Sequence, residues 1–174
     1  MARLVLSDAS PLIGLARVDG LNWLRELFGS VGITPEVVEE ILVDKGSDDE
    51  RCIRRAMTEG WLFRLEKSRT KPTYPQLGEG ESSCLRAALA RREPTLLLLD
   101  DRLARREARR AGLEIVGVAA IIGMAEQRGL IPSARAVFAT LLQSDFRIGV
   151  GIIEAVLESG AEARSIRNNA GEEP

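Results

Sequence analysis

Acidic residues follow the two most clearly apolar segments of the sequence. Asp8 comes directly after the short run 3–6, and Asp100 and Asp101 come directly after four consecutive leucines. Buried parallel strands read as short apolar runs, and the ligand sites of parallel sheets form at the carboxyl ends of strands. If the two strands are neighbours, their carboxylates share one crevice and could bind a hard cation such as Mg²⁺ or Mn²⁺.

Two glutamates are placed to join this acidic group. Glu40 lies on the helix predicted after a second short strand, and Glu81 lies in the first turn of a helix that begins near Gly78, where the helix dipole favours an anion. Taken singly, each acid also has a structural explanation, as a turn, a helix cap or a solvated residue. Packed together, the carboxylates would raise one another's pKa values, and a divalent ion would relieve that repulsion.

The sequence contains no histidine. This absence excludes Ser-His and Cys-His nucleophile systems, imidazole acid–base chemistry and nearly every zinc site. The two cysteines, Cys52 and Cys84, match no zinc spacing and no disulfide framework, so we expect both to be reduced and buried. Any catalysis must therefore use carboxylates, hydroxyls, lysine or arginine.

The bulk composition is that of a soluble globular protein, with 174 residues, 45% hydrophobic and 29% charged. The net charge of −2 neither favours nor excludes a nucleic-acid partner. Arginines are concentrated in 51–55, 91–92 and 102–110 and could steer a polyanion toward the acids, but the last of these could equally be the solvated face of a helix. No segment reads as a secretory signal or a membrane span, so we expect a cytoplasmic protein.

Short apolar runs alternate along the chain with segments of helical spacing. The predicted strands are 3–6, 31–33, 61–65, 95–99 and 113–116. The predicted helices are 11–17, 20–28, 35–44, 49–59, 79–92, 102–111, 118–128, 132–142 and 149–158. This alternation predicts the α/β class, as a three-layer α/β/α sandwich with a central parallel sheet and a helical extension at the C-terminal side.

Four segments resemble, in order, the acidic motifs of PIN-like domains, in the branch related to VapC-type toxin ribonucleases. These segments are Val5–Ile13, Pro35–Ile41, Leu77–Cys84 and Leu97–Asp101. The resemblance implies a PIN-like nuclease domain over 1–130 and a helical extension of that domain over 131–160. Residues 161–174 are small and charged, which predicts a disordered tail.

The resemblance also implies a function, a metal-dependent ribonuclease that hydrolyses RNA with Mg²⁺ or Mn²⁺. Its catalytic residues would be Asp8, Glu40, Glu81 and Asp101. Asp8 and Asp101 would bind the metal directly, Asp100 and Glu81 are further candidate ligands, and the hydroxyl of Ser10 would support the site. The family further suggests a toxin–antitoxin pair, with a small antitoxin partner and a homodimer. The chain departs from the toxins in having Glu rather than Asp at position 81.

Other functions remain open at this point. A phosphatase of the haloacid-dehalogenase type also begins with a strand and an aspartate, but it needs a second aspartate where this chain has Ser10. A dinucleotide-binding domain would need a glycine-rich turn after the first strand, which is absent here. A PIN-like protein that binds RNA or a partner without cutting is the alternative from another class.

Overall fold

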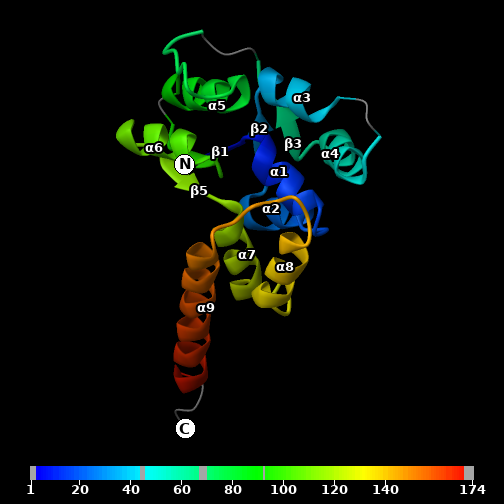
Figure 1. Cartoon of the computed structure of the whole chain (residues 1–174), viewed down its shortest axis with the longest axis vertical. Helices are drawn as coiled ribbons and strands as arrows, with labels where there is room; N and C mark the ends of the chain where they lie inside the picture. Colours follow the sequence, from blue (N-terminus) through cyan, green and yellow to red (C-terminus); the bar gives the residue numbers. More distant parts are fainter. Residues whose placement is uncertain (1–2, 44–45, 67–69, 92, 171–174) are drawn as a thin grey trace. The chain divides into compact units, whose positions relative to one another are not determined.

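The computed structural model describes residues 3–43, 46–66, 70–91 and 93–170. Figure 1 draws the whole chain in the colours of the sequence. The described strands form one all-parallel sheet in the order β3-β2-β1-β4-β5. The bounds are β1 Leu4–Ser7, β2 Val31–Ile33, β3 Leu62–Arg64, β4 Thr95–Leu98 and β5 Glu114–Val116. The predicted α/β fold with a central parallel sheet is confirmed.

Strand β1 lies at the centre of the sheet and pairs with β4 over its whole length. The register places Leu4 beside Thr95 and Ser7 beside Leu98. Every residue of β4 is buried, as four consecutive leucines predict for a strand covered on both faces. The same pairing brings the chain segments that follow β1 and β4 to one edge of the sheet.

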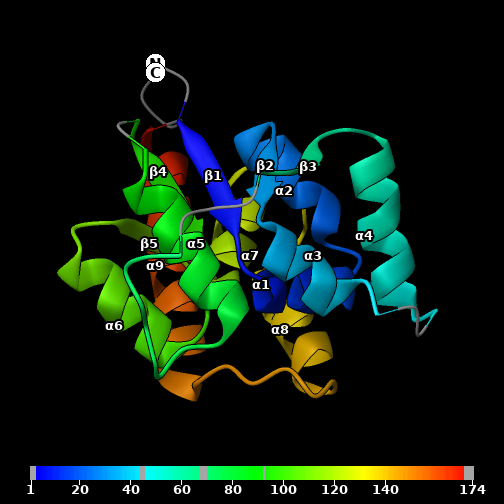
Figure 2. The ribbon, with the colours of Figure 1, turned by 90° about the horizontal axis from the view of Figure 1, so that it is seen from above.

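Helices connect the strands and pack against them (Figure 2). In the first part of the chain their bounds are α1 Ala9–Ala16, α2 Leu21–Phe28, α3 Pro35–Ile41, α4 Asp48–Thr58, α5 Glu79–Leu89 and α6 Arg102–Arg110. Helix α5 packs against both β1 and β4, and it also contacts α3 and α6. Through these contacts α5 links the elements on the two sides of the central strand.

The helices from α1 to α6 begin and end close to the predicted positions, with differences of two or three residues in α1, α3 and α5. Helix α1 begins at Ala9 rather than near Pro11, because Asp8 is itself the extended N-cap residue. Helix α3 ends at Ile41, since Leu42 leaves the helical conformation with ψ of 71°. Helix α5 ends at Leu89, and position 92, the end predicted from the sequence, lies outside the described residues.

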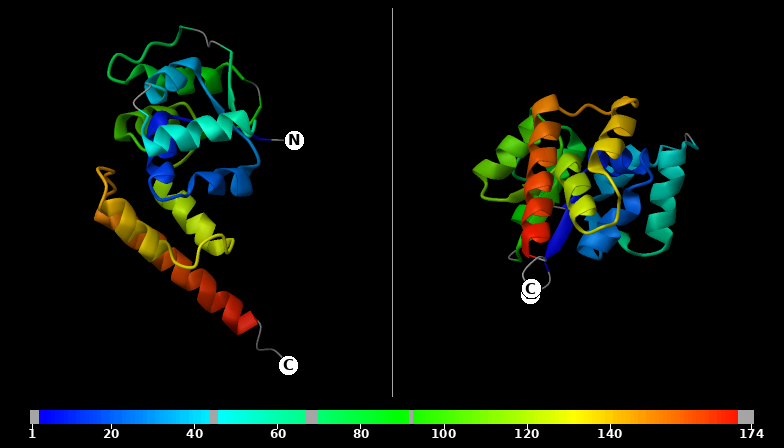
Figure 3. Two further views of the ribbon diagram at one scale, coloured as in Figure 1. Left: turned by 90° about the vertical axis from the view of Figure 1, so that its right-hand side faces the viewer. Right: turned by 90° about the horizontal axis from the view of Figure 1, so that it is seen from below.

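Residues 1–118 and 119–174 form two compact units. In the second unit, α7 (Val118–Gln127), α8 (Ala134–Leu142) and α9 (Val150–Ala170) lie side by side (Figure 3). Helix α9 passes close to Gly123 of α7, since a Cβ there would lie 2.7 Å from Val156 Cγ1. Helix α9 continues to Ala170, past the end near 158 indicated by the sequence. The domain limits at 130 and 160 and the tail over 161–174 stay predictions.

The expectation that both cysteines are buried is wrong for Cys52. Both thiols are free and Cys84 is buried, but Cys52 is exposed. Helix α4 turns Ile53 and Ala56 inward, and Cys52 points away from that face. Among the described residues, no helix is long and apolar enough to cross a membrane.

Candidate active site

The carboxyl ends of β1 and β4 form the part of the sheet where a ligand site is expected. From β1 the chain proceeds to β2 on one side, whereas β4 lies on the other side, so the strand order reverses between β1 and β4. Crevices at such reversal points bind ligands in open α/β sheets. The Asp8 N–H donates to the Leu98 carbonyl at 3.1 Å, which places Asp8 and the Asp100-Asp101 pair at the same edge.

Asp8 is a buried carboxylic acid, with only 4% of its surface exposed. The pKa of Asp8 is raised to about 7: burial is the largest cause, the Glu81 and Glu40 carboxylates add to it, and the backbone groups of Ala9 and Ser10 act in the opposite direction. Within the described part of the chain, Asp8 Oδ1 has no hydrogen-bond partner. A buried acceptor without a partner is costly, so this oxygen is suited to a ligand.

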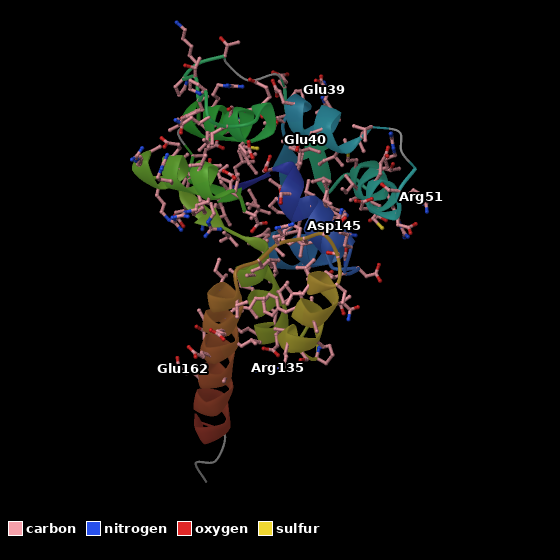
Figure 4. All side chains as sticks on the ribbon, viewed as in Figure 1. Glu39, Glu40, Arg51, Arg135, Asp145 and Glu162 are labelled. Atoms are coloured by element: carbon pink, nitrogen blue, oxygen red, sulfur yellow. The ribbon has the colours of Figure 1, made fainter. Side chains whose placement is uncertain are left out.

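Gly80 leaves a small space that two carboxylates share. A Cβ at this position would lie 2.6 Å from Glu40 Oε2 and 2.9 Å from Asp8 Oδ1. Figure 4 labels Glu40 on α3, next to Glu39. The absence of a side chain at Gly80 therefore lets the first turn of α5 approach both oxygens, one following β1 and one from α3.

Glu81 lies within electrostatic reach of the remaining carboxylates, as the pKa shifts show. Burial raises the pKa of Glu81, Asp101 raises it further, and the Gly78 backbone lowers it. Burial and then Glu81 raise the pKa of Glu40. The Glu81 carboxylate returns toward Gly78, the N-cap of α5, as an acid at the third helical position does in a capping box. Glu81 thus stabilises the start of α5 and also belongs to the cluster.

The structure separates the roles of the two adjacent aspartates after β4. Asp101 is the N-cap of α6: its Oδ1 accepts from Ala104 N at 2.8 Å, and the residue is exposed beside Glu81. Asp100 Oδ1 instead accepts from Val118 N at 3.0 Å. Burial raises the pKa of Asp100, and the Val118 backbone and Arg105 lower it. Only Asp101 shares the electrostatic environment of the cluster.

A layer of buried hydroxyl groups beneath the carboxylates was not predicted. Thr34 Oγ1 lies 2.6 Å from Ser83 Oγ, and Ser83 Oγ donates to the Gly80 carbonyl at 2.7 Å. Thr34 Oγ1 also accepts from Val37 N at 3.3 Å. Thr34 followed by Pro35 is a local pattern typical of a helix start, but nothing in the sequence indicates that Thr34 pairs with Ser83. The hydroxyl of the predicted supporting residue, Ser10, takes no part in this layer.

Glu36 of α3 is a further carboxylate, which the sequence motifs did not single out. Its Oε2 is buried and lacks a hydrogen-bond partner among the described residues. It also helps to raise the pKa of the buried Cys84 thiol, after burial itself and Asp8. The spacing of the glutamates could have indicated Glu36, since Glu36 and Glu40 are four residues apart on α3 and so share a face of the helix.

A family model described as a PIN domain matches residues 4–162. The chain is a PIN domain. The match extends from β1 into α9, so it includes all four predicted acids. The PIN domain is a nuclease fold, and its members are generally hydrolases that use divalent metals. No curated protein matches the sequence.

The donor set of this PIN domain fits a hard divalent cation. All candidate ligands are carboxylate oxygens, and Asp8 Oδ1 and Glu40 Oε2 face the same space at Gly80. Within the described ranges, no three acidic or thiol side chains converge closely enough to enclose an ion by themselves. Mg²⁺ usually keeps several waters and binds through one or two carboxylates, so a site of this openness is suited to it.

Proposed function

We propose that this PIN domain is a metal-dependent endoribonuclease that hydrolyses phosphodiester bonds of RNA. The observation that carries the proposal is the meeting of Asp8 Oδ1 and Glu40 Oε2 at Gly80, in a PIN domain whose Glu81 and Asp101 lie within electrostatic reach. Membership of this family favours a nuclease over the phosphatase alternative.

Asp8 and Asp101 are the proposed direct ligands of Mg²⁺ or Mn²⁺, and Glu81 is a further ligand. When bound, the cation would lower the pKa of water and stabilise negative charge on the phosphoryl oxygens. Asp100 is the weaker candidate, because Asp101 raises the pKa of Glu81, whereas no carboxylate of the cluster contributes to the pKa shift of Asp100. Ser10 keeps its proposed supporting role through the chain segment next to Asp8.

The glutamates of the cluster are suited to handling the proton of the attacking water. The pKa values of Glu40 and Glu81 are raised, and both carboxyl groups are half-buried or exposed at the mouth of the site. A general base works best when its pKa approaches the working pH. Glu40 is the better base, because Glu81 is also engaged with the Gly78 backbone.

The test is the cleavage of a labelled single-stranded RNA with Mn²⁺ or Mg²⁺, comparing the wild type, Asp8→Asn and the wild type in EDTA. Asp145→Asn is the matched control, because Asp145 is exposed and belongs to the second unit. Cleavage that both EDTA and Asp8→Asn abolish, and that Asp145→Asn retains, supports the proposal. A folded protein that cuts equally well in EDTA contradicts it.

A role as the toxin of a toxin–antitoxin pair belongs to the same proposal. A small antitoxin would insert an arginine or lysine among the carboxylates, and the toxin would form a homodimer in the cytoplasm. Light scattering that finds a monomer at micromolar concentration contradicts the dimer. If the protein binds RNA and Mn²⁺ but cuts no RNA, the function is that of a PIN domain that binds without cutting.

A further inference from the structure

A groove lies beside the acid cluster, between the chain segment 73–77 and helix α6. It has a volume of about 360 Å³, within the range of small-ligand sites. Leu77 on its wall directly precedes Gly78, the N-cap of the helix that carries Glu81. The opposite wall belongs to α6, whose N-cap is Asp101. The groove is therefore lined by the loop that precedes the helix of Glu81 and by the helix that follows Asp101.

The α6 wall of the groove is strongly basic. Helix α6 contains five arginines and one glutamate, and Arg106, Glu107 and Arg110 line the groove. Glu107 pairs with Arg110 at 3.0 Å and with Arg106 at 3.4 Å, so the two guanidinium groups lie near one carboxylate with a positive charge left over. Both arginine side chains are at least half exposed. Their remaining N–H groups can donate to a phosphate.

The opposite wall offers an aromatic ring and apolar side chains. Tyr74 is half-buried, and its pKa is raised first by burial and then by Glu107, while Arg86 lowers it. Its phenol group therefore lies within electrostatic reach of Glu107 and Arg86. Pro75 and Leu77 extend the same wall. An aromatic ring beside arginines is the combination that binds single-stranded nucleic acid, since bases stack on the ring and phosphates pair with the cations.

We infer that this groove binds a nucleotide of a single-stranded RNA adjacent to the cleaved bond, with its base on Tyr74 and its phosphate between Arg106 and Arg110. The inference rests on the proposed function, because it takes the substrate to be RNA and the acids to be the cutting site. At a rise of 1.5 Å per residue, Arg106 lies about 7.5 Å along the helix from Asp101. A strand positioned at the acids therefore continues into the groove.

The experiment is fluorescence anisotropy of a short labelled single-stranded RNA in EDTA, where binding is measured without metal or cleavage. The test variant carries Arg106→Ala and Arg110→Ala. The matched control carries Arg102→Ala and Arg109→Ala, which removes the same charge from exposed positions of the same helix outside the groove. Circular dichroism confirms that each variant is folded.

We expect the groove variant to bind RNA at least tenfold more weakly than the control variant. The slope of log affinity against log salt concentration should also become less steep by about 0.7, as expected for one lost phosphate contact on a single strand. Tyr74→Ala should weaken binding by about tenfold, and Tyr74→Phe, which keeps the ring, should not. Equal losses in the groove and control variants would overturn the inference. They would show that RNA responds to the total positive charge of α6 and not to the groove.

The two proposals fail in different ways. If RNA binds through the groove but is never cut when Mn²⁺ is added, the groove inference is supported and the nuclease proposal fails. If RNA is cut and neither the double arginine variant nor Tyr74→Ala changes its binding, the nuclease stands and the groove inference fails.

Discussion

Thr34 Oγ1 and Ser83 Oγ lie 2.6 Å apart, and this contact joins the starts of the two helices that carry the glutamates of the site. Thr34 is the N-cap of α3, which bears Glu40, and Ser83 lies in the first turns of α5, which bears Glu81. Both residues are fully buried. The relative position of the two glutamates therefore depends on a pair of hydroxyl groups that never meets the substrate.

Ser83→Ala should destabilise the protein by about 1–3 kcal/mol, because it leaves the buried Thr34 hydroxyl without its partner and the Gly80 carbonyl without its donor. Urea unfolding monitored by circular dichroism measures this change. Ser30→Ala is the control, since Ser30 is exposed. Equal stability of the two variants would show that the hydroxyl pair contributes nothing.

Gly80→Ala should weaken Mn²⁺ binding at least tenfold while leaving the fold intact. The new methyl group would lie 2.6 Å from Glu40 Oε2 and 2.9 Å from Asp8 Oδ1, so it would push apart the oxygens that share this space. Alanine is otherwise the better helix former, which favours folding of the variant. Isothermal titration with Mn²⁺ measures the effect. Gly151→Ala is the control, because a Cβ there meets nothing within 4 Å; a similar loss in both variants would refute the prediction.

Metal-free protein should lose stability as the pH rises through about 7. The pKa of Asp8 is raised from 3.8 to about 7, so the folded state holds this proton more tightly than the unfolded state does. The associated stability is present below about pH 4 and is lost above pH 7, with an upper limit of about 4 kcal/mol. Urea unfolding at several pH values, with and without Asp8→Asn, measures it. The prediction fails if the variant shows the same fall in stability between pH 5 and 8 as the wild type.

Mn²⁺ binding should strengthen over the same pH range, because the cation competes with the proton on Asp8. With one linked proton of pKa about 7, we expect the affinity to fall about twofold from pH 8 to 7 and about fivefold from pH 7 to 6, approaching about tenfold for each unit at lower pH. Titrations at pH 6, 7 and 8 measure this dependence. An affinity that does not change with pH would mean that Asp8 is not a ligand.

Asp101→Asn should reduce cleavage at least a hundredfold, whereas Asp100→Asn should retain most of it. Asparagine is as good an N-cap as aspartate, so the Asp101 variant keeps the start of α6 and loses only the charge. An amide at position 100 can still accept from Val118 N. RNA cleavage rates in Mn²⁺, with thermal unfolding as the folding control, measure both variants. The reverse order of activities would make Asp100 the ligand.

The local parts of this structure could be read from the sequence, and the reason is physical. Four consecutive leucines predict a strand buried on both faces, and β4 is such a strand. The Thr34-Pro35 cap and the glycine after α2 mark helix ends that need only neighbouring residues. Glu40 was predicted as a site residue from the family resemblance, and its Oε2 lies 2.6 Å from where a Cβ of residue 80 would be.

The parts that could not be predicted depend on residues far apart in the chain. No local pattern reports that β4 pairs with β1, so the shared position of Asp8 and Asp101 remained conditional until the strand order was known. The Thr34–Ser83 pair also joins residues far apart in the chain, so no local pattern indicates it. Cys52 was misassigned because hydrophobic residue types are only usually buried, and its position on α4 faces outward.

The central position of β1 also determines at what point during synthesis of the chain the acid cluster can first assemble. Asp8 comes from the first strand of the sheet, but its neighbour β4 and the Asp101 that follows lie near the end of the first unit. At about 5–20 residues per second, a ribosome needs several seconds to make the intervening chain. A product interrupted before β4 carries Asp8 and Glu40 but neither the strand that holds them at the sheet edge nor Asp101. Incomplete chains therefore contain no assembled cluster while they are still surrounded by the RNA from which they are translated.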